Sequence, residues 1–446
     1  MARVSAARNA AFEILRTVDR GQAHSDDLLR GKAVSALAPQ NRNLATALVL
    51  GVLRWQVELD QSLRPLLKRP NAKLESEVLI ALRLGAFQLL HLDRIPARAA
   101  IDESVELAKQ SGHRFASAMV NAVLRKLAMQ PKQSVPSKAN PPRELQAYPP
   151  WMRDRWEAFF GAEIACAICV HGQSQPSPAL RIEDDGVEEE LSLAGIRLAP
   201  GEILTGARIV LSGDISSTGA FREGHVRLQD EGSQLVAEIA GQGSCILDCC
   251  AAPGGKALIL AERNPQARIV ACEASPRRLE AMRNRFLLLA DRIEFRLADV
   301  TASTDESLYD LVLADVPCSG TGTLGRNPEI RHRLKPEEFA RQAERQSAIL
   351  NSSLRAARPG GRVIYSTCSL EPEENEQVIS GVLTRQANAQ VIPLGSRIED
   401  MREEGILTAV GADKLQSCIT PEGFLRLFPG ALGTDGFFVA MLEKSE

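Results

Sequence analysis

Two cysteines stand where predicted strands end. Cys368 lies between the apolar run RVIYS and the acidic stretch EPEENE, and Cys318 lies in the stretch ADVPCSGTGTLG. An ionised thiol is a strong nucleophile, although a free cysteine has a pKa of ~8.5. Each thiol taken alone would be interpreted as a small packing residue. Two of them at strand ends raise the question of which reaction needs a pair.

A glycine-containing turn follows another predicted strand, in the run CILDCCAAPGGKALILAE. Such a turn lets backbone amides at a helix N-terminus approach an anionic group. A phosphate-binding P-loop is excluded because Cys250 and Ala257 replace its glycine and its Ser or Thr, and the three-glycine dinucleotide fingerprint is absent. The turn therefore favours a cofactor with a carboxylate and few phosphates. The expected cofactor-binding residues here are Cys250, Ala251, Ala252, Pro253, Gly254, Gly255 and Lys256.

Acidic residues end the next two predicted strands. Glu273, 18 residues after Gly255, suits both hydroxyls of a ribose and would repel a ribose phosphate. Asp299 suits the amino group of an adenine. Acids in this position often cap helices instead, so each is weak evidence alone. Together with the turn they predict S-adenosyl-L-methionine as cofactor, with S-adenosyl-L-homocysteine as its product.

The surrounding pattern predicts a multidomain α/β protein. Residues 1–135 read as an all-helical domain, and a proline-rich linker with a small α/β segment fills 136–234. From 235 to 446, short apolar runs alternate with amphipathic helices, which predicts a doubly wound, Rossmann-like and mainly parallel sheet. The run DGFFVAML is expected to form a last strand, antiparallel at the sheet edge. Ligands of such sheets bind at the carboxyl ends of the strands.

Composition restricts the class of protein further. The chain has 446 residues and nine cysteines, an odd number that favours reduced thiols and a cytoplasmic protein. No apolar run is long enough to span a membrane. Residues 1–130 hold 19 Lys and Arg against 12 Asp and Glu, a net of +7, whereas the remainder holds 34 against 44, a net of −10. A basic N-terminal third suggests an anionic partner such as nucleic acid, although an ordinary spread of solvated charge explains it equally well.

The motifs resemble those of the RNA cytosine-5 methyltransferases. They are CCAAPGGK, ADVPCSGTG, YSTCSLEPEENE and GTDGFFVAML. LVLGVLRWQVELD, LRLGAFQLLHLDRIPARAAIDESVELAK and MVNAVLRK extend the resemblance to the ribosomal small-subunit methyltransferase B family (RsmB, also called Sun or Fmu). The resemblance implies a NusB-like RNA-binding domain at 1–135 and a class I methyltransferase domain at 235–446. It further implies a soluble, monomeric enzyme that methylates carbon 5 of a cytosine in 16S ribosomal RNA, naked or in an assembling particle.

The resemblance also assigns roles to the two thiols. Carbon 5 of cytosine becomes nucleophilic only after a thiolate adds to carbon 6. In the RNA enzymes this nucleophile follows the fifth strand, which here implies Cys368. Cys318 then serves the release step, in which carbon 5 loses its proton and the thiolate of Cys368 is expelled from the base. Asp315 is expected at the amino edge of the cytosine and Lys256 beside the base or the cofactor, so both count as catalytic and as cofactor-binding residues.

Several other groups have two readings. The first turn of a helix that begins near Pro372 would suit the acids Glu371, Glu373 and Glu374. If they lie close to Cys368 instead, their negative charges would oppose ionisation of its thiol. Lone cysteines and scattered histidines predict no metal site. Contacts with RNA phosphates are expected from a basic group after Cys318. A second series of arginines between 277 and 296 either extends this line of phosphate contacts or belongs to a solvated helix face. The basic group comprises Arg326, Arg331, Arg333 and Lys335.

Two other functions compete with the methyltransferase reading. One is a NusB-like RNA-binding or antitermination scaffold with a non-catalytic methyltransferase domain, against which the intact thiols, Asp315 and the glycine turn speak. The other is a nucleotide-dependent oxidoreductase, which is disfavoured because the sequence lacks the three-glycine dinucleotide fingerprint.

Overall fold

The computed structural model describes residues 4–130, 143–182, 185–285, 292–302 and 305–445. Within these ranges, no helix is long and apolar enough to cross a membrane. The chain divides into two compact units. The first comprises Met1–Gln175 and Leu324–Arg333, and the second comprises Pro176–Thr323 and Leu334–Glu446. Residues 131–142, which include the start of the expected linker at 136, lie outside the described residues.

The first unit is helical, as its apolar periodicity of three and four residues predicts. Its core is formed by aliphatic side chains of the long helices, among them Leu15, Leu48, Leu82 and Leu124, all of which are buried. The helices are α1 (Ala6–Asp19), α2 (Ser25–Leu29), α3 (Lys32–Ser35), α4 (Pro39–Leu63), α5 (Ser76–His91), α6 (Ala97–Gln110), α7 (Ser117–Met129), α8 (Pro150–Phe160), α9 (Ala162–Gln173) and α15 (Ile330–Arg333).

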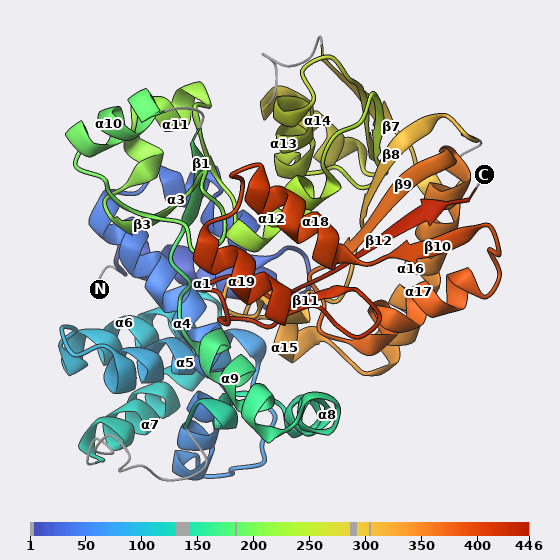
Figure 1. Ribbon diagram of the computed structural model, residues 1–446. Coiled ribbons are helices and arrows are strands. Elements are labelled where there is room, and N and C mark those ends of the chain that lie inside the picture. Colours follow the sequence, from blue (N-terminus) through green and yellow to red (C-terminus); the bar gives the residue numbers. More distant parts are fainter. Residues whose placement is uncertain (1–3, 131–142, 183–184, 286–291, 303–304, 446) are drawn as a thin grey trace. The chain divides into compact units, whose positions relative to one another are not determined.

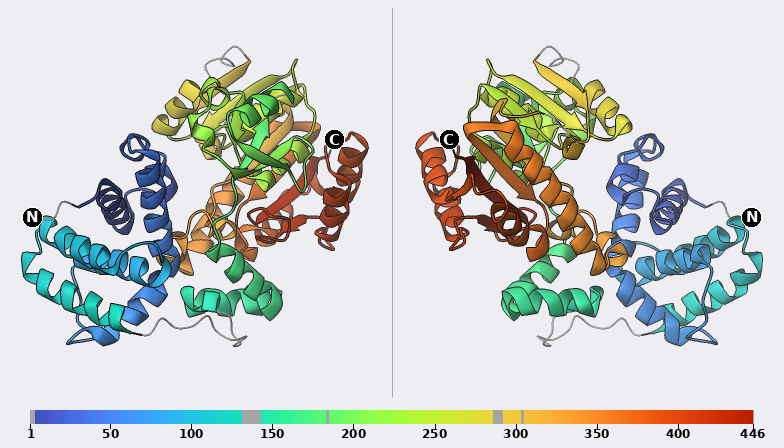
Figure 2. Two further views of the ribbon diagram at one scale, coloured as in Figure 1. Left: turned by 90° about the vertical axis from the view of Figure 1, so that its left-hand side faces the viewer. Right: turned by 90° about the vertical axis from the view of Figure 1, so that its right-hand side faces the viewer.

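The segment Leu324–Arg333, which contains α15, belongs to this helical unit and follows the long chain segment of the second unit (Figure 2). Arg331 is 1% exposed, and its guanidinium carbon lies 4.0 Å from the centroid of the Tyr148 ring. Its Nη2 donates to the carbonyl oxygens of Gly172 (3.0 Å) and Leu324 (3.3 Å). The expectation that Arg331 meets phosphates is therefore wrong, because the side chain is used inside the protein.

Other side chains fix the same segment. Glu329, 1% exposed, accepts hydrogen bonds from the backbone nitrogen (2.9 Å) and Oγ (2.8 Å) of Ser25. Arg333 donates to the carbonyls of Val18 and Ala23. The chain thus leaves the second unit just after the motif that holds Cys318, is fixed in the first unit for ten residues, and returns at Leu334.

The second unit begins with a small antiparallel sheet in the order β2-β3-β1-β4. Three of its strands contain the stretches ALRI, ARIVLS and VRL, and the fourth, β2, contains the less apolar stretch RLAP. Leu180, Leu191 and Val210 are buried in its core. The strands are β1 (Ala179–Ile182), β2 (Arg197–Pro200), β3 (Ala207–Ser212) and β4 (Val226–Leu228), with helices α10 (Asp185–Leu193) and α11 (Gly219–Glu223).

A larger sheet forms the rest of this unit, in the order β10-β12-β9-β8-β5-β6-β7. The five expected strands are present and parallel to one another. The last strand, β12, is antiparallel to β9 as predicted, but it is not the edge, because β10 pairs with its other side. The strands are β5 (Cys245–Asp248), β6 (Arg268–Glu273), β7 (Ile293–Leu297), β8 (Tyr309–Asp315), β9 (Ala357–Thr367), β10 (Ala389–Ile392), β11 (Leu425–Leu427), which pairs with β12, and β12 (Phe437–Lys444).

Helices cover both faces of this sheet, which confirms the doubly wound fold. Alternate side chains of the buried strands enter two different cores, as in Ile246 and Leu247 of β5. One face packs against α12 (Glu231–Ala240), α13 (Gly255–Arg263), α18 (Leu394–Glu403) and α19 (Ala409–Ser417), and the other against α16 (Glu337–Ala356) and α17 (Glu376–Leu383). Strand order reverses between β5 and β8, the position where ligands of such sheets bind.

Candidate active site

The two thiols follow neighbouring strands. β8 and β9 are parallel, with Asp315 paired to Ser366, so the loops that begin after them start at the same edge of the sheet. Cys318 and Cys368 are both half-buried there, and their Sγ atoms lie 3.2 Å apart. The structure brings together two residues that are 50 positions apart in sequence.

The surroundings of Cys318 oppose its ionisation. The hydrogen bond with Cys368 and burial raise the pKa of Cys318, and the negative charges of Cys368 and Glu374 add to this increase. Cys318 thus holds its proton more firmly than a free thiol does.

A lysine and an aspartate lie beside the thiols. Lys256 Nζ is 2.7 Å from Asp315 Oδ2, and the Oγ of Ser366 donates to Asp315 Oδ1 at 2.7 Å. Burial alone would lower the pKa of Lys256, but Asp315, with smaller contributions from Cys368 and Asp248, raises it above its usual value. A positively charged ammonium group therefore lies near both Asp315 and Cys368.

The glycine turn joins β5 to α13 as expected. Gly254 has a φ of +102°, a conformation that favours glycine, and a Cβ on Gly255 would come within 2.8 Å of Gln229 Oε1. Ala251 donates from its backbone nitrogen to Cys272 O (2.9 Å), which ties the turn to β6. Ala251 and Ala252 are buried, whereas Pro253 is exposed.

Glu273 lies at the end of β6 and is only 5% exposed. Its Oε1 accepts from the backbone nitrogen of Ser275 (2.8 Å), and its Oε2 lies 3.2 Å from Arg278 Nη1. Arg278 also donates to the carbonyl of Ala252 at 2.7 Å. One member of the uncertain arginine series thus connects two of the expected cofactor segments, through Glu273 and the glycine turn.

Asp299, unlike Glu273, is exposed. Its Oδ1 accepts from the nitrogen (3.0 Å) and Oγ1 (2.7 Å) of Thr301, and these hydrogen bonds lower the pKa of Asp299. This is the capping arrangement that acids after strands often adopt.

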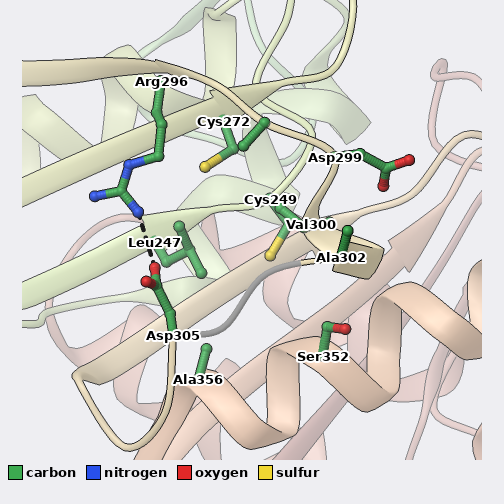
Figure 3. A pocket seen from close by; sticks show the side chains of 11 residues that line it. Leu247, Cys249, Cys272, Arg296, Asp299, Val300, Ala302, Asp305, Ser352 and Ala356 are labelled. Carbon is green, nitrogen blue, oxygen red and sulfur yellow. Dashed lines mark hydrogen bonds and ion pairs between the residues drawn. The ribbon is translucent and has the colours of Figure 1, made fainter.

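A cavity of about 330 Å³ lies next to Asp299 (Figure 3). Cys249 and Cys272 line it, and an ion pair between Arg296 and Asp305, 2.8 Å long, lies on one side. Among the described residues of its wall, Asp299 alone belongs to the expected cofactor set. The cavity therefore adjoins the expected cofactor segments, and neither Cys318 nor Cys368 lines it.

Two buried carboxylates belong to the site. Asp248 was not selected from the sequence, whereas Glu374 was considered either for a helical first turn or for a place near Cys368. Asp248, at the end of β5, is 1% exposed, and no described residue bonds to its Oδ2. Burial, with contributions from Asp315 and Glu273 that Lys256 opposes, raises the pKa of Asp248 to about 7. Glu374 is fully buried and bonds to residues next to both thiols. Asp248 ends its strand as Glu273 and Asp315 end theirs, a signal that was present in the sequence.

The site fits S-adenosyl-L-methionine. A buried acid with an unsatisfied oxygen suits the positively charged end of that molecule. The tight turn before α13 suits its carboxylate, and Glu273 suits its ribose.

Comparison with known proteins agrees with these features. Residues 239–443 match the model of the family described as 16S rRNA methyltransferase RsmB/F, and residues 5–129 match the NusB family. A probable ribosomal RNA small subunit methyltransferase B from Bacillus subtilis is 32% identical over 98% of both chains. The ribosomal RNA small subunit methyltransferase B of Xanthomonas campestris is also 32% identical, over 99% of this chain and 97% of its own.

Solved structures show the same fold. The crystal structure of PH0851 covers 99% of this chain and all of its own, with a TM-score of 0.79 and 22% identity. NSun6 from Pyrococcus horikoshii, solved with SFG, has a TM-score of 0.55 and 17% identity over 67% of this chain and 98% of its own. With S-adenosyl-L-methionine as its cofactor, the chain belongs to the RsmB/F family of 16S rRNA methyltransferases.

Proposed function

We propose that this protein transfers a methyl group from S-adenosyl-L-methionine to carbon 5 of a cytosine in 16S ribosomal RNA, through a covalent bond between Cys368 and the base. The observation that carries the proposal is the pair of thiols 3.2 Å apart, next to the ion pair of Lys256 and Asp315. A methyl transfer to a nitrogen or a hydroxyl would need neither thiol, whereas methylation of carbon 5 uses both.

Cys368 is the nucleophile in this proposal. Its thiolate forms a bond to carbon 6 of the cytosine, and the electrons of the double bond between carbons 5 and 6 make carbon 5 nucleophilic. Lys256 stabilises the thiolate, and Asp315 binds the amino edge of the base. S-adenosyl-L-methionine supplies the methyl group, and S-adenosyl-L-homocysteine leaves.

Cys318 is the base of the release step. Cys318 first gives its own proton to solvent. As a thiolate it then takes the proton from carbon 5, the electrons of that bond restore the double bond between carbons 5 and 6, and the bond from carbon 6 to Cys368 breaks. Cys368 leaves as a thiolate, so the nucleophile is regenerated. A thiol that binds its proton firmly makes a strong base once ionised, which suits Cys318 to this task.

The cofactor residues are proposed from the turn and the strand ends. The turn from Cys250 to Lys256 and the N-terminus of α13 take the carboxylate, Glu273 takes the ribose hydroxyls, and Asp299 lies on the adenine side. Asp248 joins this set because its buried Oδ2 faces no described partner. Asp315 is shared between cofactor and base.

The helical domain is proposed to bind RNA. It matches the NusB family over 5–129, and residues 1–130 carry a net charge of +7. A base inside a helix is unreachable for the thiols, so the target cytosine is expected in a single-stranded or flipped conformation.

The test is a transfer assay with labelled S-adenosyl-L-methionine and small-subunit RNA, followed by mass spectrometry of the nucleosides. Label in 5-methylcytidine supports the proposal. Label in another nucleoside contradicts the carbon 5 chemistry, and absence of label in RNA that the protein nevertheless binds supports a non-catalytic scaffold. Bisulfite sequencing of ribosomal RNA from a deletion strain then identifies the cytosine.

A further inference from the structure

Glu374 makes an unusual set of contacts for a buried side chain. Its carboxylate is 0% exposed and lies at the end of the 3₁₀ turn Pro372–Glu374. Its Oε1 accepts from the backbone nitrogen of Ser319 (2.9 Å) and from Gln346 Nε2 (2.9 Å), and its Oε2 accepts from the hydroxyls of Ser319 and Ser369. A buried carboxylate with four donors is well compensated for its loss of water.

The two serines directly follow the two thiols. Ser319 comes after Cys318, Ser369 comes after Cys368, and their Oγ atoms lie 3.0 Å apart. One carboxylate therefore bonds to the neighbours of both sulfur atoms. Because each thiol is one peptide bond from a serine held by Glu374, a shift of that carboxylate would change the separation of the sulfur atoms.

Further hydrogen bonds join the two loops. Gly322 donates from its nitrogen to Cys368 O (2.9 Å), and the nitrogen of Leu370 donates to Thr321 Oγ1 (2.9 Å). Gln346 also donates to the carbonyl of Pro317 at 2.9 Å. Glu374 is the charged member of this network, so its effect on the thiols extends beyond packing.

Three titratable groups face Cys318. Among the described residues they are Cys368 after β9, Glu374 in the 3₁₀ turn and Tyr365 on β9, and a backbone hydrogen bond with Gly320 acts in the opposite direction. When Cys368 bonds to carbon, it loses its negative charge, so one of the causes that oppose ionisation of Cys318 disappears.

We propose that Glu374 is a positioning residue that aligns the thiols of Cys318 and Cys368 and orders their use, so that Cys368 attacks first and Cys318 removes the proton afterwards. This inference rests on the proposed function of the two thiols. It follows from the contacts of one carboxylate with both serines and from its negative charge beside Cys318.

The first test measures the thiols without RNA. The full chain is alkylated with iodoacetamide at a series of pH values, and trypsin separates the two cysteines, because Arg326 and Arg362 lie between them. The variant is Glu374→Gln, in which an amide replaces the charge and the serine hydroxyls can reorient. The matched control is Glu373→Gln, which removes a carboxylate from a half-buried neighbour.

In Glu374→Gln the pH midpoint of Cys318 alkylation is expected to fall by about one unit relative to the wild type and the control. An unchanged midpoint in a variant with wild-type circular dichroism would overturn the inference. Should Glu374→Gln not fold, Glu374→Asp keeps the charge and shortens the reach. Its expected result is a wild-type midpoint with at least tenfold slower formation of the RNA adduct, and adduct formation at the wild-type rate would overturn the inference.

The second test follows the covalent adduct with RNA. The pH profile of adduct release is expected to move to lower pH in Glu374→Gln and to stay unchanged in Glu373→Gln. Equal profiles contradict the role of Glu374. If the wild-type protein forms no 5-methylcytidine, the proposed function fails, and the alkylation midpoints still decide whether Glu374 controls Cys318.

Discussion

The Sγ atoms of Cys318 and Cys368 lie 3.2 Å apart at the ends of β8 and β9. Because these strands are adjacent and parallel, their following loops share one sheet edge. This proximity is what the proposed reaction needs for two sulfur atoms to act on one base, and substitution of each thiol can separate their two proposed roles.

Replacing Cys368 by Ala should abolish methylation. Without the thiolate no bond to carbon 6 forms, and carbon 5 stays unreactive. Transfer of labelled methyl to small-subunit RNA is the measurement, with Cys166→Ala as a control that removes a thiol in α9. Substantial turnover by Cys368→Ala would reverse the assignment.

Replacing Cys318 by Ala should allow attack and methyl transfer but not release. The methylated base then stays bound to Cys368, and a slowly migrating protein–RNA band is expected on a denaturing gel. The double variant Cys318→Ala with Cys368→Ala should lose the band. A band from Cys368→Ala alone would mean that the two roles are exchanged.

Asp248 should make cofactor affinity depend on pH near neutrality. Its pKa is raised to about 7, so the buried carboxyl is neutral below this pH and charged above it. Affinity for the cationic S-adenosyl-L-methionine is expected to rise as the pH increases from 6 to 8. Calorimetric titration measures it, and Asp248→Asn should flatten the dependence. A wild-type slope in that variant would remove Asp248 from the cofactor site.

Asp248 should also make the stability of the ligand-free protein depend on pH. The free energy of unfolding is expected to fall as the pH rises, whereas cofactor affinity rises. The folded state holds the proton of Asp248 more tightly than the unfolded state, whose value is near 3.8. Its contribution to the free energy of unfolding is therefore fully present below pH 3.8 and is lost as the pH rises to about 7. Urea unfolding at pH 5 and 7 measures this, and Asp248→Asn should show a smaller decrease than the wild type. An equal decrease in both proteins would mean that Asp248 does not hold its proton in the folded state.

Glu273→Ala should weaken cofactor binding without preventing folding. Loss of a hydrogen bond to a charged group costs about 1.5–3 kcal/mol, roughly tenfold to hundredfold in Kd. The change is measured by calorimetry with S-adenosyl-L-homocysteine. Arg278→Ala serves as the comparison, because it removes the partner of Glu273 and leaves the carboxylate. Unchanged affinity in Glu273→Ala would contradict its assignment.

Arg331→Met should lower stability rather than RNA affinity. The carbonyls of Gly172 and Leu324 would lose their donor, which costs about 1–3 kcal/mol. Urea unfolding measures this, and Lys335→Ala is the exposed control. The salt dependence of RNA binding should stay unchanged, because a buried guanidinium releases no counterions from RNA. If Arg331→Met had wild-type stability and a weaker salt dependence of RNA binding, Arg331 would contact a phosphate after all.

The alternation of apolar runs and helices, together with the residues at the strand ends, was enough to predict the doubly wound sheet, the helical domain and the cofactor. Those features depend on local periodicity and on residue types at turns, and both are properties of short stretches of sequence. The sequence also contained Asp248 at a strand end, but an acid there is common. Asp248 is distinguished only by its burial with an Oδ2 that bonds to no described residue. The edge position predicted for β12 failed because β10, a short run of modest hydrophobicity, pairs beyond it.

Tertiary structure alone decided the use of the charged side chains. Arg331 resembles a phosphate contact in sequence, and it is buried over Tyr148 because its segment belongs to the helical unit. Glu374 resembles one more acid in a helical first turn, and it binds two serines from loops 50 residues apart. Local patterns report which face of an element is apolar, but the partner of a charged group depends on which distant segment the fold brings within hydrogen-bonding distance.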